Sequence, residues 1–267
     1  MATLVTRVLP MAPGRASGWR LVQRNYLVYR RAWPVFVTGF LEPIFYLFSI
    51  GIGVSQLVGA ITLPGGDVVT YTAFVAPAML ASSAMNGAVF DSTYNIFFRM
   101  KYAKLYDAVL ATPMRPWDVA TGEITWALLR GAIYSSVFVL VMLAMGLVGS
   151  WWALLALPAT LLVGFAFAAA GMALTTFMRS WQDFEFVQLS ILPMFLFSAT
   201  FFPVSVYPAG VQWLVEVTPL YRAVVLCREL VTGSVTWASG ISVVYLIAMG
   251  AVGLFVASRR LSTLLLK

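Results

Sequence analysis

The chain has 267 residues, of which 61% are hydrophobic and only 10% are charged, and its formal net charge at pH 7 is +7. A globular protein needs a larger polar share to cover its surface, so this composition excludes a soluble enzyme and indicates that lipid surrounds most side chains. The basic residues lie in alternate gaps between apolar runs, a pattern typical of membrane topology rather than of nucleic-acid binding. We therefore expect an all-α integral membrane protein with one membrane domain over residues 17–267.

The N-terminal segment divides into a tail and a helix. Residues 1–16 combine prolines and a glycine with small and basic residues, which predicts a disordered tail. Over residues 17–31, apolar and basic residues alternate at helical spacing, with Trp19, Val22, Tyr26 and Tyr29 on one face and Arg20, Arg24 and Arg31 on another. This pattern predicts an amphipathic helix in the headgroup layer; the alternative is a plain helical extension whose arginines only set topology.

Six apolar runs follow, and each is a candidate transmembrane helix. They cover residues 32–58, 69–90, 119–147, 152–178, 186–202 and 237–257. The fifth run is the shortest and contains Pro193, so its crossing depends on neighbours that satisfy the carbonyl group freed by the proline. Glycines such as Gly51, Gly53, Gly164 and Gly171 would let helices approach closely.

The orientation follows from the lysines and arginines, which are retained near span ends on the cytoplasmic side. If both termini are cytoplasmic, the outer segments contain only Arg222 and Arg228, and nearly all other basic residues lie inside. Because an even number of spans places both basic termini on one side, this asymmetry favours six spans.

Two segments outside the spans are more apolar than solvated loops. In the cytoplasmic gap, Tyr102, Leu105, Tyr106, Val109 and Leu110 repeat at helical intervals before Pro113 and Pro116. We expect a short amphipathic helix there that docks either on the membrane or on a partner subunit. In the outer gap, residues 211–217 and 220–230 are two short apolar runs separated by a Thr-Pro pair. They predict two re-entrant half-helices or an interfacial plug held by structural salt bridges.

Two charged residues lie deep in the predicted spans. Glu42 and Arg130 are each roughly 15 Å from the cytoplasmic start of their spans, so their matched depth predicts an ion pair between the two helices. Glu123 is a competing partner for Arg130 nearer the membrane surface. The functional alternative for these charges is contact with a substrate.

Enzymatic functions find little support in the residue types. The chain has no histidine, one cysteine and no Gly-x-x-x-x-Gly-Lys-[Ser/Thr] loop, so His-based catalysis, metal sites and a P-loop nucleotide site are not expected. If the protein is an active transporter, another polypeptide must supply the energy. A lipid transferase would need convergent carboxylates such as Asp91, Glu123, Asp183 and Glu185, and a purely structural subunit is the remaining alternative.

Three stretches carry a resemblance to a known family. They are residues 40–53, residues 76–86 with the following 97–102, and residues 201–208 leading to a signature of Phe202, Pro203, Pro219, Arg222 and Arg228. Together they resemble the permease subunits of bacterial ABC type-2 exporters, in the branch that contains the nodulation lipo-oligosaccharide and daunorubicin exporters.

The resemblance implies a six-span permease of the bacterial cytoplasmic membrane, paired with a second copy and with two separate ATPase subunits that bind ATP and Mg²⁺. The chain itself would hold no cofactor. The segment from Lys101 to Leu110, namely Lys101, Tyr102, Leu105, Tyr106, Val109 and Leu110, would be the helix that couples to the ATPase, and the outer half-helices would cap the pathway. The implied cargo is lipid-like, with anthracycline-type drug efflux as the alternative.

Overall fold

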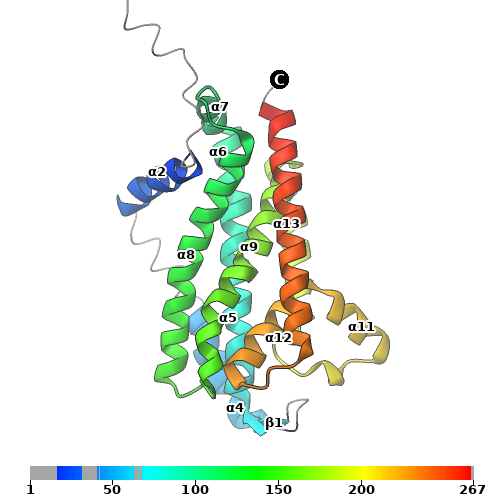
Figure 1. Cartoon of the computed structure of the whole chain (residues 1–267). Coiled ribbons are helices and arrows are strands. Elements are labelled where there is room, and N and C mark those ends of the chain that lie inside the picture. The colour runs from blue at the N-terminus through cyan, green and yellow to red at the C-terminus, as the bar shows by residue number, and fades with distance from the viewer. Residues whose placement is uncertain (1–16, 32–40, 42, 63–65, 67, 266–267) are drawn as a thin grey trace, which may run out of the picture.

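The computed structural model describes residues 17–31, 41, 43–62, 66 and 68–265. Long helices lie side by side in one bundle, with α7 and the C-terminus at one end and α11 near the other (Figure 1). We call these the α7 end and the α11 end. The expected tail, residues 1–16, and the first part of the first expected span lie outside the described residues.

Four described helices are long and apolar enough to cross a membrane. They correspond to the second, third, fourth and sixth expected spans. The first of them is continuous through α5 (Tyr71–Phe90), the π-helical segment η2 (Asp91–Asn95) and α6 (Ile96–Lys101). The second is α8 (Pro116–Ala144), and the third joins the 3₁₀ turn η3 (Trp151–Leu155) to α9 (Ala156–Thr175). The fourth is α13 (Trp237–Leu265). The second expected span therefore does not end at Phe90, because its helix continues to Lys101.

The other two expected spans have shorter described helices. Of residues 32–58, the structure describes the second half, which includes the π-helical η1 (Leu47–Ile52) and α4 (Gly53–Val58). In the fifth run, α10 covers only Phe184–Leu196, which at about 1.5 Å per residue is roughly 20 Å long and shorter than the hydrocarbon core. The helix ends where the Phe197 amide bonds to the Pro193 carbonyl at 2.8 Å. The helix therefore ends six residues before the expected end of the run at residue 202, and the fifth crossing stays a prediction.

The N-terminal helix α2 has the expected bounds, Ser17–Arg31, and packs against α8. Its approach is close, since a Cβ atom on Gly122 of α8 would lie 2.7 Å from the Gly18 carbonyl oxygen. Val22 is buried in this contact, whereas Trp19 and Tyr26 remain exposed. The expected single apolar face is therefore divided, with one part on the bundle and another directed outward.

A short β-ribbon interrupts the otherwise helical chain, so the all-α expectation needs a local correction. Strand β1 (Ala60–Thr62) pairs antiparallel with β2 (Val68–Thr70). The Thr70 side chain then accepts a bond from the Ala73 amide at 3.3 Å, which caps α5 directly after the ribbon.

The segment between α10 and α13 forms the two expected short helices, α11 (Ala209–Val217) and α12 (Pro219–Thr232). Thr218 caps α12, Pro219 occupies its first position, and Gly233 ends it with a positive φ of 87°. Helix α12 packs against α5 and α13, whereas α11 projects from the bundle (Figure 1).

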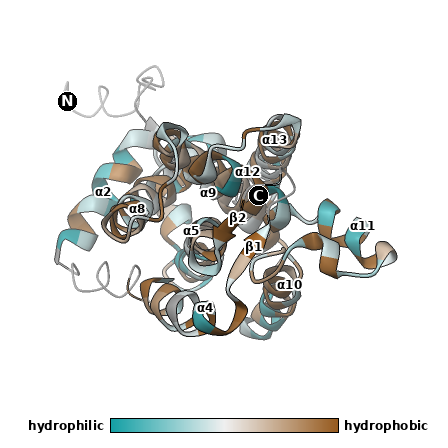
Figure 2. Ribbon diagram, turned by 90° about the horizontal axis from the view of Figure 1, so that it is seen from below, coloured by the Kyte–Doolittle hydropathy of each residue, from teal (hydrophilic) through white to brown (hydrophobic). Residues whose placement is uncertain are grey.

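The bundle core is built around α5 and α9. Seen from the α11 end, α5 is surrounded by other elements on most sides (Figure 2). In the continuous helix Tyr71–Lys101, to which α5 belongs, 72% of the apolar stretch is buried. Helix α9 packs closely on α13, because a Cβ atom on Gly253 would lie 2.7 Å from the carbonyl carbon of Ala169.

Candidate functional site: buried charges at the α7 end

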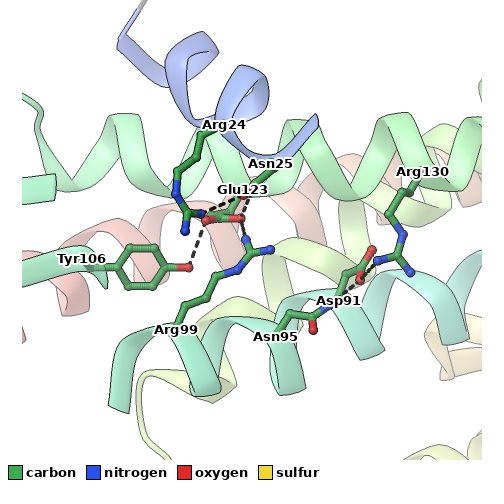
Figure 3. Close-up of polar contacts among 8 residues, drawn as sticks. All are labelled: Arg24, Asn25, Asp91, Asn95, Arg99, Tyr106, Glu123 and Arg130. Carbon is green, nitrogen blue, oxygen red and sulfur yellow. Dashed lines mark hydrogen bonds and ion pairs between the residues drawn. The ribbon is translucent and has the colours of Figure 1, made fainter. Parts of the chain in front are cut away.

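The carboxylate of Glu123 on α8 is the centre of a polar cluster. Its side chain is only 2% exposed and forms an ion pair with Arg99 of α6. The Asn25 amide of α2 donates to it at 3.0 Å, and the Tyr106 hydroxyl of α7 donates at 3.2 Å. Figure 3 shows these side chains converging from four helices. We call these four residues the Glu123 cluster.

A sharp turn brings α7 to this cluster. Helix α6 ends at Lys101, Lys104 adopts a left-handed conformation with φ of 45°, and α7 covers Leu105–Leu110. Left-handed backbone is costly for a residue with a side chain, so the contacts of α7 must hold this turn in place. The expected continuous helix from Lys101 to Leu110 is therefore wrong.

The residues expected to contact an ATPase fall into two groups. Lys101 and Tyr102 are exposed at the turn. Leu105, Val109 and Leu110 pack against the hydrophobic core of this chain, and Tyr106 is fully buried. The apolar face of α7 is therefore occupied by the chain itself. The turn, together with the exposed Asp107, is the part left for a partner.

The hydrogen bonds in the Glu123 cluster have defined directions. Burial and the neighbouring Glu123 charge raise the pKa of Tyr106 well above its usual value, so this hydroxyl stays protonated and donates. Arg24 donates to the Asn25 side-chain oxygen at 3.2 Å, which leaves the Asn25 amide group directed at Glu123.

A second cluster lies deeper along the same helices. Asp91, in the π-helical segment, lies 2.8 Å from Arg130 of α8 and accepts a bond from Asn95 at 2.7 Å. The Arg130 guanidinium also lies 5.3 Å from the centroid of the Tyr29 ring of α2 and 5.6 Å from that of Tyr134. We call Asp91, Asn95 and Arg130 the Asp91 cluster.

These contacts give Arg130 a partner that sequence reasoning missed. Glu42, its expected partner, lies outside the described residues, so that ion pair stays a prediction. Glu123, the competing partner, pairs with Arg99. One signal in the sequence could have found both pairs, because Asp91 and Arg99 are eight residues apart and Glu123 and Arg130 are seven apart. If the two helices run antiparallel, these similar spacings bring Asp91 level with Arg130 and Arg99 level with Glu123, so each acidic residue faces a basic one.

The five signature residues of the last stretch that carries the family resemblance are only partly brought together. Arg228 of α12 bonds to the carbonyl oxygens of Phe74 at 3.2 Å and Ala199 at 2.8 Å, with its guanidinium 3.8 Å from the Phe74 ring centroid. Arg222 lies near the Tyr221 ring on the same helix. Pro219 begins α12, Phe202 contacts the Tyr207 ring, and Pro203 precedes a short 3₁₀ turn, η5 (Val204–Val206).

Three of the four carboxylates considered for catalysis have other partners, and the fourth, Glu185, is exposed in the first turn of α10. Asp91 and Glu123 belong to the two ion-paired clusters, and Asp183 accepts bonds from the Arg179 and Ser180 amides at 2.6 and 3.1 Å. Among the described residues there is no group of three His, Cys, Asp or Glu side chains suited to a metal. The cavity beside Asp91 has a volume of about 10 Å³, room for roughly one water molecule.

Comparisons with known proteins agree with this architecture. The model of the ABC-2 type transporter family matches residues 17–232, from the first residue of α2 to the last residue of α12. Nodulation protein J of Rhizobium leguminosarum bv. trifolii is 37% identical over 225 residues, which cover 83% of this chain and 84% of that protein. Its counterpart in bv. viciae is 34% identical over 257 residues, covering 93% and 97%. The chain belongs to the ABC-2 type transporter family and is a membrane permease.

Proposed function

We propose that this chain is the permease subunit of an ATP-driven exporter in the bacterial cytoplasmic membrane. The cargo we propose is lipid-like, a lipo-oligosaccharide or another hydrophobic molecule, which is consistent with similarity to nodulation protein J. A separate ATPase would supply the energy, because the sequence has no P-loop. ATP and Mg²⁺ would bind only to that partner.

The distribution of basic residues supports an orientation with the α7 end in the cytoplasm. That end carries the turn between α6 and α7, the start of α8, the turn after α9 and the last turns of α13, with their basic residues Lys101, Lys104, Arg115, Arg179, Arg259 and Arg260. The opposite end carries Arg222 and Arg228 of α12. By the positive-inside rule, this distribution supports our proposal that the α7 end faces the cytoplasm. Six crossings remain our proposal, with α4 and α10 belonging to the two shorter ones.

The Glu123 cluster is the observation that supports a coupling role. One carboxylate connects α7 to α2, α6 and α8, and it is almost fully buried. If α7 moved alone, it would leave buried polar groups without partners at a cost of about 1–3 kcal/mol each. We therefore propose that a force applied by the ATPase at the turn before α7 moves these four helices together.

A second copy of the chain is part of the proposal, in a closed two-fold arrangement. Helix α10 supports it, because large apolar side chains remain uncovered along its length, namely Phe186, Leu189, Leu192 and Leu196. Such a face requires either lipid or another protein as its neighbour.

The test separates contact with the ATPase from transmission through the permease. The double substitution Lys101→Glu and Lys104→Glu changes the exposed turn and should abolish co-purification of the ATPase. Glu123→Gln lies beneath the surface, so it should keep co-purification but lose substrate-stimulated ATP hydrolysis in proteoliposomes. Arg20→Glu, on the exposed side of α2, is the matched control and should change neither.

The proposal fails if the ATPase still co-purifies with the Lys101→Glu, Lys104→Glu variant at the wild-type ratio. Transport into inverted vesicles, measured with a labelled lipo-oligosaccharide and separately with an anthracycline, decides between the two cargo classes.

A further inference from the structure

A groove at the α7 end lies between the start of α8 and the last turns of α13. Its volume is about 410 Å³. Arg115 and Trp117 line it from the α8 side, and Phe255, Arg259 and Ser262 line it from α13. None of these residues belongs to the Glu123 or Asp91 cluster.

The groove carries positive charge that no ion pair among the described residues neutralises. Arg115 and Arg259 are both exposed, and within the described part of the chain neither forms an ion pair with a carboxylate. The nearby Asp118 carboxylate accepts a bond from the Arg115 backbone amide at 2.9 Å and caps α8. The next arginine, Arg260, packs over the Phe177 ring at 4.3 Å, so it is held away from the groove. The groove therefore suits an anion.

The polarity of the groove changes along the bundle axis. On α13, Phe255 lies about one helical turn deeper than Arg259 and about two turns deeper than Ser262. Phe255 is 59% exposed. Below it, exposed apolar residues continue along α13 toward the α11 end, namely Val252, Ile247, Val244 and Ile241. A ligand with an anionic head and an apolar tail matches this order.

We propose that this groove binds the phosphate headgroup of an anionic phospholipid, with the acyl chains along the exposed face of α13. Basic pockets between membrane helices are suited to such headgroups. An acidic segment of a partner protein could use the two arginines but would leave the apolar face of α13 unexplained. This lipid site does not depend on the proposed cargo or on the proposed ATPase partner. Only its assignment to the cytoplasmic leaflet rests on the proposed orientation.

Native mass spectrometry of the purified protein with equal amounts of phosphatidylglycerol and phosphatidylcholine tests the site. We expect wild type to retain phosphatidylglycerol about tenfold better. Arg115→Gln with Arg259→Gln should remove most of this preference. Arg20→Gln with Arg30→Gln removes two exposed arginines of α2 and is the matched control, which should keep it. An unchanged preference in the groove variant, or an equal loss in both variants, would overturn the proposal.

Three further measurements distinguish a lipid site from a folding defect, a free-phosphate site and a protein contact. If the groove variant aggregates, Phe255→Ser keeps both charges and should still weaken phosphatidylglycerol retention; unchanged retention counts against the site. Inorganic phosphate should not displace the lipid at equal concentration, and displacement would identify a free-phosphate site instead. Loss of ATPase co-purification with lipid retention intact would make the groove a protein contact and reject the lipid.

Discussion

The α7 end and the α11 end hold their charged side chains in different ways. At the α7 end, the Glu123 carboxylate pairs with Arg99 and accepts bonds from α2 and α7. At the α11 end, Arg228 bonds to two backbone carbonyls and lies over the Phe74 ring, and no ion pair is present there within the described residues. The adjacent Glu229 bonds to the Thr236 amide and hydroxyl and to Ser239, at the start of α13.

This difference indicates different mechanical roles. Side-chain ion pairs join separate helices, and because a buried pair is costly to break, a helix that shifts carries its partners with it. Hydrogen bonds from a side chain to backbone carbonyls hold one local arrangement of the backbone. Here the Arg228 side chain holds α12 against α5 and against the backbone at Ala199. The α7 end is therefore suited to transmitting movement, and the α11 end to holding α12 in place.

The largest effect is expected for Glu123→Ala. The substitution leaves the Arg99 guanidinium, 14% exposed, without its carboxylate. Removing one partner of a buried ion pair costs about 3–5 kcal/mol, measurable as a fall in the detergent-solubilised melting temperature. The double variant Glu123→Ala, Arg99→Ala should recover part of the loss. A single variant as stable as wild type would contradict the role of this cluster.

Arg228→Met is the corresponding change at the α11 end. It leaves the Phe74 and Ala199 carbonyls without their donor, at a cost of about 1–3 kcal/mol. Because this contact fixes a chain path, we expect lower stability but intact ATPase co-purification. Loss of co-purification in a folded variant would remove the distinction between the two ends.

Gly122→Ala tests the contact that brings α2 to the cluster. The new methyl group would meet the Gly18 carbonyl at 2.7 Å and should destabilise the protein by about 1–3 kcal/mol. Gly131→Ala, on the same helix with no atom within 4 Å of the added Cβ, is the matched control and should be neutral or slightly stabilising. Equal effects of the two changes would show that α2 does not depend on this close approach.

Tyr106→Phe removes one of the donors to Glu123 and keeps the ring. We expect a loss of about 1 kcal/mol, because Arg99 and Asn25 still bond to the carboxylate. If α7 is coupled through this hydroxyl, substrate-stimulated ATP hydrolysis should fall more than stability does. A fall in stability alone would limit Tyr106 to a structural role.

The smallest effect is expected for Asp183→Asn, in the turn after α9. Bonds from the Arg179 and Ser180 amides lower the pKa of Asp183, so its contribution is present above the unfolded pKa and is lost as pH falls through the folded value. The wild-type and variant melting temperatures should therefore differ slightly at neutral pH and converge in acid. A difference that grows in acid would contradict this assignment.

The amino-acid sequence by itself determined that this is a membrane protein, and it determined where most helices lie along the chain. Apolar runs and the flanking arginines predicted four of the long helices, the bounds of α2 and the Thr218-Pro219 break between α11 and α12. These features depend on local composition and spacing. The end of the second helix was missed, because the polar stretch after Phe90 continues as π-helix and α-helix, buried against α8 and α9.

Only the tertiary structure decided which charges meet and which face of α7 is covered. The sequence offered Glu42 and Glu123 as partners for Arg130, and the packing of η2 against α8 placed Asp91 beside it instead. The turn at Lys104 folded Tyr106 inward, which no periodicity could show. The physical reason is that helical spacing assigns a residue to a face, whereas the neighbour of that face depends on contacts between segments far apart in the chain.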